Sequence, residues 1–423
     1  MSRDLITNLI PRMYRIKQTI NNPTVKNVEE EIEKQMKKIL PLIKSGNKIG
    51  IAAGSRGIYN YKNMIKKVVE IVKAVGAKPY IIPAMGSHGG ATAEGQIKIL
   101  ENYGISEEKI GAPIKATMET VNLGITPEGA TVYFDKYAAS LDGVILINRV
   151  KSHTDFRSNV ESGILKQIAV GLGKQKGASE IHRYGIYGLQ KLISSAAKIS
   201  IDKAPILGGI AILENAEGTT AKIAVMPKDK ILEQEPKLLK EAKTLLPLLP
   251  CFPLDVLVIQ EMGKNISGVG MDPNITGRYL IRGESDDQSK AIYRIVCLDL
   301  TEESHHNATG VGIADVISDR LLKKIDFEAT YTNVVTSGFL ERGFLPVVGK
   351  NDTSAINIAL SCCNKYISKE NARMALIKNT LEINELLISQ RIFNEIKSLD
   401  AIEVIGEETL NFDHEGNLNF PFK

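Results

Sequence analysis

Short apolar segments alternate with amphipathic helical segments in this chain, and this order of elements constrains the fold more than any other sequence feature. Residues 48–54, 79–84 and 142–148 are apolar runs of strand length, whereas apolar residues recur at helical spacing over 27–44 and 61–75. Near-continuous apolar strands separated by helices are typical of a mainly parallel sheet whose two faces are covered by helices. The sequence therefore predicts an α/β fold.

The length of the chain predicts two domains. Its 423 residues exceed what one ordinary hydrophobic core supports. The segment 245–253 carries three prolines, and a second series of apolar strands begins after it, at residue 255. We predict an N-terminal catalytic and cofactor-binding domain over 1–250 and a C-terminal α/β domain over 251–423 that closes over the site. Each domain is expected to be a mainly parallel sheet flanked by helices, with the active site in the interdomain cleft.

Composition argues against several classes of protein. A net charge of +4 is too small an excess to indicate nucleic-acid binding, and with 5% aromatic residues and no tryptophan the chain has few side chains for base stacking. The sequence has no apolar run of about 18 residues, the usual length of a membrane span. Its first 20 residues carry scattered charges instead of a signal peptide, and its four cysteines form no CxxC pair. We expect a cytoplasmic enzyme with neither nucleic-acid nor membrane partners.

Polar, glycine-rich turns follow the first three predicted strands. Arg56 lies in the first turn, His88 in the second and His153 in the third. The carboxyl ends of parallel strands meet at one edge of a sheet, where ligands bind. A neutral imidazole can act as acid, base or metal ligand. A single histidine is more often structural, but two at the ends of consecutive predicted strands favour a functional site.

Lys166 and the two glycine-containing turns have both a functional and a structural interpretation. Mostly apolar neighbours surround Lys166, and a buried lysine becomes a nucleophilic amine, although a lysine stem lying along a helix surface is commoner. The guanidinium of Arg56 suits a carboxylate or phosphate, or simply lies at the surface. Backbone N–H groups of the segment 86–90 could bind a phosphate. In the second domain, the loop 261–274 either closes over a ligand or only connects two elements.

Five motifs, taken in their order, resemble the nickel-dependent lactate racemase family. The resemblance covers roughly residues 45–215. The motifs are Ser55-Arg56, Gly86-Ser87-His88, Ser152-His153, Gly163-Ile164-Leu165-Lys166 and Ile181-His182. The resemblance implies an isomerase that uses a nickel-pincer nucleotide, pyridinium-3,5-bisthiocarboxylic acid mononucleotide nickel, made by cofactor biosynthesis proteins. It further implies that the chain acts on a small 2-hydroxy acid.

The resemblance also assigns roles to residues of this chain. His182 would be the protein ligand of nickel, and imidazole suits that metal. Lys166 would hold the cofactor, in some members through a covalent thioamide. The remaining expected cofactor contacts are Ser55, Gly86 and Ser87.

Substrate chemistry follows from the same resemblance. His88 and His153 would be the acid and base on either side of the substrate carbon, and Arg56 would bind the substrate carboxylate. The cofactor would accept and return the hydride, which no side chain can do. The family's lysine motif has an arginine before the lysine and a further glycine, whereas this chain has Ile164 and Leu165 there. The residues 268–274 differ from the aromatic, lysine-containing loop of lactate racemases, so we predict a racemase or epimerase of a 2-hydroxy acid other than lactate.

Two other functions are compatible with the residues. A metal-dependent hydrolase could hold zinc with His88, His153 and His182, since catalytic zinc takes three protein ligands, although the sequence lacks HxH and HExxH motifs. A non-catalytic nucleotide- or metabolite-binding protein could have the same fold. Metal analysis separates the first alternative from a nickel enzyme, and the effect of His88→Ala on binding and turnover separates the second.

Overall fold

The computed structural model describes residues 8–20, 22–363 and 366–422 and forms two compact units. The N-terminal unit is Asn21–Leu246, and the C-terminal unit combines Met1–Ile20 with Pro247–Lys423. The structure differs here from the sequence-based division, which placed the first 20 residues in the N-terminal domain. Strand β1 (Met13–Gln18) pairs with two strands near the end of the chain, and its Met13 and Ile16 are buried in the cores of that unit.

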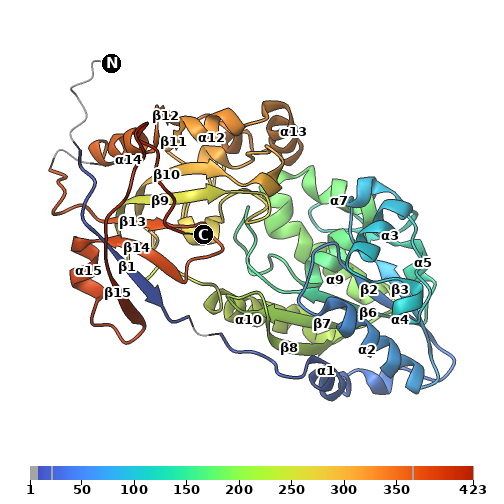
Figure 1. Ribbon diagram of the computed structural model, residues 1–423. Coiled ribbons are helices and arrows are strands. Elements are labelled where there is room, and N and C mark those ends of the chain that lie inside the picture. The colour runs from blue at the N-terminus through green and yellow to red at the C-terminus, as the bar shows by residue number, and fades with distance from the viewer. Residues whose placement is uncertain (1–7, 21, 364–365, 423) are drawn as a thin grey trace. The chain divides into compact units, whose positions relative to one another are not determined.

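The N-terminal unit contains a five-stranded sheet with the order β3-β2-β6-β7-β8 (Figure 1). All neighbouring strands are parallel except β7 and β8, and a separate antiparallel hairpin joins β4 and β5. The strands are β2 (Lys48–Ala53), β3 (Lys78–Pro83), β4 (Thr120–Ile125), β5 (Thr131–Asp135), β6 (Gly143–Arg149), β7 (Ile206–Glu214) and β8 (Thr220–Pro227). The main helices are α1 (Val28–Met36), α2 (Tyr61–Ala74), α3 (Ala93–Asn102), α7 (Lys174–His182), α9 (Ile193–Lys203) and α10 (Ile231–Thr244). Shorter ones are α4 (Glu107–Ile110), α5 (Lys136–Ala139), α6 (Ile164–Lys166) and α8 (Gly185–Tyr187).

Side chains of successive strand residues enter two different cores. In β6, Ile145 and Ile147 join the core that contains α1 and α2, whereas Val144 and Leu146 join the core that contains α9 and α10. This alternation explains why the strands read as continuous apolar runs, because helices cover both faces of the sheet. The parallel strands β2, β3 and β6 consequently direct their carboxyl ends to one edge.

The C-terminal unit contains an eight-stranded sheet with the order β12-β11-β10-β9-β13-β14-β1-β15. Its strands are parallel from β12 to β13 and antiparallel from there to β15. The strands besides β1 are β9 (Leu254–Met262), β10 (Ile292–Leu300), β11 (Val316–Ser318), β12 (Val347–Gly349), β13 (Met374–Ile377), β14 (Glu385–Ser389) and β15 (Ile402–Glu408). The helices are α11 (Pro273–Thr276), α12 (Asp319–Lys324), α13 (Phe327–Ser337), α14 (Asp352–Ser361) and α15 (Gln390–Ile396). The predicted α/β class, with mainly parallel sheets flanked by helices, is confirmed.

Within the described residues, no helix has both the length and the apolar character needed to cross a membrane.

Candidate active site

The first two predicted turns contact each other at the carboxyl edge of the N-terminal sheet. Ser55 and Arg56 follow β2, and the half-buried Ser55 hydroxyl is hydrogen-bonded to Nδ1 of His88, which follows β3. Arg56 itself is exposed. The Tyr103 hydroxyl donates to the Ser55 carbonyl at 2.9 Å and fixes the first turn from α3's end. The residues predicted from two separate strand ends therefore lie side by side.

A buried amide holds the backbone of the second turn. The Gln96 side chain, on α3, donates to the carbonyl oxygens of Gly86 at 2.9 Å and of His88 at 3.3 Å. Gly86 is buried with φ of +61°, and its N–H donates to the Gly171 carbonyl, whereas Ser87 is exposed. The orientation of His88 thus depends on α3 as well as on Ser55.

A buried lysine extends this support. Lys174 and Asp135 are both inaccessible to solvent and lie 3.0 Å apart, from Nζ to Oδ2. The same ammonium donates to Gln96 Oε1 at 3.3 Å and to the Pro83 carbonyl at the end of β3. A fully desolvated charge pair therefore holds both the strand end and the amide that orients the His88 turn.

The third turn brings His153 to Lys166. Their Nε2 and Nζ atoms lie 2.6 Å apart, and the Asp155 backbone N–H donates to His153 Nδ1 at 3.1 Å. Since Nδ1 accepts a hydrogen bond, the proton of a neutral imidazole lies on Nε2 and points at the lysine nitrogen. Lys166 can accept this bond in its neutral form, which predominates above its pKa of about 8. The Phe156 ring packs against His153, with centroids 4.6 Å apart.

Burial and nearby cations lower the pKa values of the site. Burial, foremost, together with the charges of Arg56 and Lys151, lowers the pKa of Lys166 to about 8. Burial and the Lys166 charge bring the pKa of His153 well below its usual value. His88 is exposed by surface area, yet the surrounding protein, Arg56 and Lys166 lower its pKa. The imidazoles of His88 and His153 are therefore predominantly neutral at pH 7, as an acid/base pair or a metal ligand requires.

His182 lies at the exposed end of α7 and belongs to the same electrostatic group. Partial burial lowers its pKa, Lys166 lowers it further, and Asp155 acts in the opposite sense. The structure thus gathers Arg56, His88, Lys166 and His182 within electrostatic range of one another, with His153 in direct contact with the lysine. Across the described residues, no group of three histidine, cysteine, aspartate or glutamate side chains is arranged to hold a metal.

Two buried polar atoms beside these residues have no hydrogen-bond partner. They are Ser152 Oγ and Gln167 Oε1, which adjoin His153 and Lys166 in sequence. The amide nitrogen of Gln167 donates to the carbonyl oxygens of Ala52 and Ile147, each at 3.2 Å, so the side chain lies across the ends of β2 and β6. Unpartnered buried polar atoms are costly, and a ligand with polar atoms would satisfy them.

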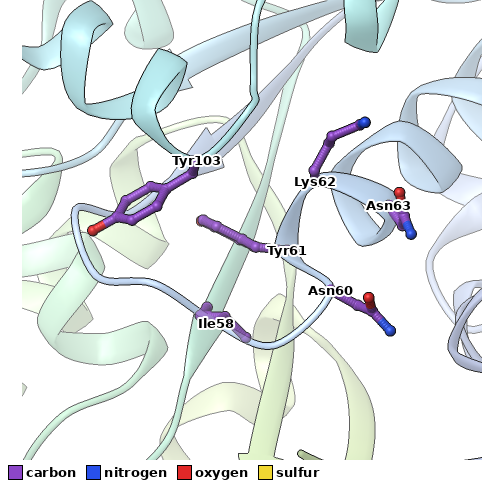
Figure 2. A pocket seen from close by; sticks show the side chains of 6 residues that line it. All are labelled: Ile58, Asn60, Tyr61, Lys62, Asn63 and Tyr103. Atoms are coloured by element: carbon purple, nitrogen blue, oxygen red, sulfur yellow. The ribbon is translucent and has the colours of Figure 1, made fainter.

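A cavity of about 330 Å³ lies beside the first turn (Figure 2). Its lining comprises Ile58, Asn60, Tyr61, Lys62, Asn63 and Tyr103. The two tyrosines also fix the turn, because the Tyr61 hydroxyl accepts the Gly54 N–H at 2.8 Å while Tyr103 binds Ser55. None of the predicted catalytic or metal-binding residues lines this cavity, so it adjoins the candidate site without forming it.

In the C-terminal unit, hydrogen bonds to other segments hold the loop 261–274. Lys264 donates to Asn333 at 2.6 Å, and the Thr301 hydroxyl donates to Asn265 at 2.7 Å. His305 and His306 follow with left-handed backbones, and both are exposed. This polar loop follows β9, at the carboxyl edge of the parallel part of its sheet.

Comparison with known proteins finds similarity to lactate racemases. Residues 7–187 match the family model of the lactate racemase N-terminal domain. The solved lactate racemase apoprotein from Thermoanaerobacterium thermosaccharolyticum has a similar fold, with a TM-score of 0.51 and 10% sequence identity, over 87% of this chain and 94% of that chain. No curated protein matches the sequence. At this identity the structural likeness shows the fold, and the matched segment includes all five motifs.

Proposed function

We propose that the chain is a member of the lactate racemase family, whose N-terminal domain model matches residues 7–187, and that it racemises or epimerises a 2-hydroxy acid other than lactate with a nickel-pincer nucleotide. The family supports a racemase-type, isomerase function in general. The contact between Lys166 and His153 carries the specific proposal, because it joins a candidate base to a candidate cofactor anchor.

The described residues fit the cofactor in three respects. Lys166 offers an amine whose pKa of about 8 gives ready access to the neutral form that a covalent thioamide needs, and the lowered pKa of His182 favours the neutral imidazole that nickel binds. The orphaned Ser152 and Gln167 atoms could meet polar atoms of a bound nucleotide. When bound, the cofactor would supply a hydride acceptor, which the twenty side chains lack.

His88 and His153 would move the hydroxyl proton of the substrate. Inversion needs one base on each side of the carbon, and two imidazoles with lowered pKa values can exchange these roles. Each imidazole is oriented through Nδ1, His88 by Ser55 and His153 by the Asp155 N–H. This leaves Nε2 of each ring for proton exchange, with Lys166 beside that of His153 in the absence of cofactor.

Arg56 would bind the substrate carboxylate through its planar guanidinium. It is exposed and lies next to Ser55, which orients His88, so one turn would serve both carboxylate binding and proton transfer. The residues 268–274 differ from the aromatic, lysine-containing loop of lactate racemases, which supports a substrate with a longer or more polar side chain.

The test is production of the full chain together with a nickel-pincer cofactor biosynthesis system, followed by metal analysis and intact mass. About one nickel per chain, retained in the surface variant His414→Ala and lost in His182→Ala, is expected. A mass increment mapping to Lys166 would show covalent attachment. The loaded protein is then incubated with a panel of chiral 2-hydroxy acids, and at least one is expected to lose its configuration.

Two results would contradict the proposal. If the chain contains no nickel despite confirmed cofactor production, the proposed cofactor is wrong, and zinc in its place would favour a hydrolase. If nickel is bound but no acid of the panel changes configuration, the proposed racemase reaction is wrong.

A further inference from the structure

Helix α10 contacts α6, the short helix that ends at Lys166, although the two helices are far apart in the sequence. The buried face of this helix includes Ile231, Glu235, Leu238, Leu239 and Ala242. Glu235 is the one acidic residue of that face and is 1% exposed. A carboxyl group at such a position needs hydrogen-bond donors around it.

The donors are the first backbone N–H groups of α6. Oε2 of Glu235 accepts from Ile164 at 2.7 Å and from Leu165 at 3.1 Å, and Oε1 lies 3.3 Å from the Leu165 nitrogen. The first N–H groups of a helix have no partner within the helix. Glu235 therefore caps, from another helix, the turn whose next residue is Lys166.

Gly163 makes room for this cap. A Cβ atom at this position would lie 2.5 Å from Glu235 Oε1 and 2.7 Å from its carboxyl carbon. Any side chain at residue 163 would push the carboxyl group away from the two N–H groups. The glycine of the lysine motif thus has a partner that the motif itself does not contain.

Helix α10 is also linked to the His153 turn, through the charged side chain of Lys243. Lys243 donates to Glu161 Oε1 at 2.7 Å, and Glu161 Oε2 accepts the His153 backbone N–H at 2.7 Å. The Glu161 side chain is completely buried. Helix α10 is therefore linked to both residues of the pair, to Lys166 through the two preceding backbone N–H groups and to His153 through Glu161.

We propose that Glu235 is a positioning residue that fixes the start of α6 and thereby keeps the Lys166 amine buried against His153. The inference deepens the proposed function, since Lys166 is there the cofactor anchor. Glu235 touches neither the lysine nitrogen nor His153 and acts only through the backbone.

Replacing Glu235 can raise or lower the pKa of Lys166, depending on which of two effects is larger. Asp155 and Glu161 raise the pKa of the lysine, whereas Arg56 and Lys151 lower it, and burial lowers it most, to about 8. Loss of a nearby negative charge, by itself, lowers a lysine pKa further. Release of α6 gives the amine access to water, and this raises the pKa of Lys166. The two effects of replacing Glu235 are therefore opposite.

The experiment measures the reactivity of Lys166 in the cofactor-free full chain. Acetic anhydride labels neutral amines, and peptide mass spectrometry quantifies labelling of Lys166 from pH 6 to 11. We expect the midpoint to rise by about one pH unit or more in Glu235→Leu and by less in Glu235→Gln, whose amide oxygen can still accept. Gly163→Ala, which displaces the carboxyl group, is expected to raise it as well.

Two controls on α10 separate positioning from other effects. Glu233→Gln alters an exposed carboxylate paired with Lys237, and Leu239→Ala removes buried apolar atoms of the same helix face and leaves the Glu235 carboxyl group in place. Both are expected to leave the Lys166 midpoint unchanged. A midpoint that stays or falls in folded Glu235→Gln and Gly163→Ala overturns the proposal, even if Glu235→Leu does not fold. Racemase activity is not read, so failure of the proposed function leaves this result intact.

Discussion

At the scale of single residues, the N-terminal unit contains a fully buried ion pair between Lys174 and Asp135. Neither side chain reaches solvent, and the lysine backbone has a positive φ of 53°. Burial lowers the pKa of Lys174, whereas Asp135 opposes this shift. The ion pair lies under the end of β3, so its integrity matters to the turn that carries His88.

Lys174→Met is expected to destabilise the protein by about 3–5 kcal/mol, because it leaves the Asp135 charge buried and unpaired. Urea denaturation followed by circular dichroism measures the loss. The exposed Lys176→Met serves as the control, with an expected change within about 0.5 kcal/mol. The double variant Asp135→Leu with Lys174→Met should recover much of the stability, and a double variant as unstable as Lys174→Met would contradict this explanation.

Sequence reasoning identified the candidate residues that end strands and missed those that support them. Arg56, His88 and His153 follow apolar runs, so their proximity could be predicted from the geometry of parallel strands. Glu235 binds the start of α6 across 71 residues of the chain and Lys243 binds Glu161 across 82, which no local pattern encodes. The position of Glu235 among apolar residues at helical spacing was the available signal, since a charge on a buried face needs a partner.

At the scale of elements, the regular strands were predictable and the irregular helices were not. The segments 48–54, 79–84 and 142–148 became β2, β3 and β6 to within a residue or two. Residues 164–171 form α6 and then a π-helical stretch, Gln167–Gly171, in place of one regular α-helix. Apolar spacing cannot distinguish these turns, and π-helical turns often accompany functional sites.

The apolar residues of the segment 385–396 belong to two different elements. Strand β14 occupies Glu385–Ser389, and α15 begins only at Gln390. Leu386, Leu387 and Ile388 are completely buried within the sheet, so their continuous apolar run reflects a strand covered on both faces. Periodicity alone cannot separate such a run from a buried helix.

Helix α3 should influence His88 through the amide of Gln96. Gln96→Leu removes the donor to the Gly86 and His88 carbonyl oxygens and is expected to cost about 1–3 kcal/mol, because buried acceptors lose their partner. With the turn loosened, the pKa of His88 should rise toward that of an ordinary histidine. NMR titration of the imidazole tests this, with the exposed Lys98→Leu on the same helix as control. An unchanged His88 pKa in a folded variant would contradict the predicted coupling.

At the scale of the whole molecule, the first strand completes the sheet of the last residues. Strand β1 lies between β14 and β15, and Ile16 is fully buried in that unit (Figure 1). Ile16→Ala is expected to destabilise the C-terminal unit by about 2–5 kcal/mol. Hydrogen exchange should show faster opening of β14 and β15, with β2 and β3 unchanged. Equal acceleration in both units would contradict an assignment of β1 to the C-terminal unit.

The placement of β1 has a consequence for protein synthesis. Residues 21–246 are contiguous, so this unit can fold on the ribosome as soon as it has emerged. The other unit cannot be completed until β14 and β15 have been translated, because β1 pairs with both of them and, among the described residues, β15 pairs with β1 alone. Strand β1 must therefore wait, unpaired, while the strands from β2 to β13 are made. During that interval its apolar residues are a natural target for chaperones that bind extended, nascent segments.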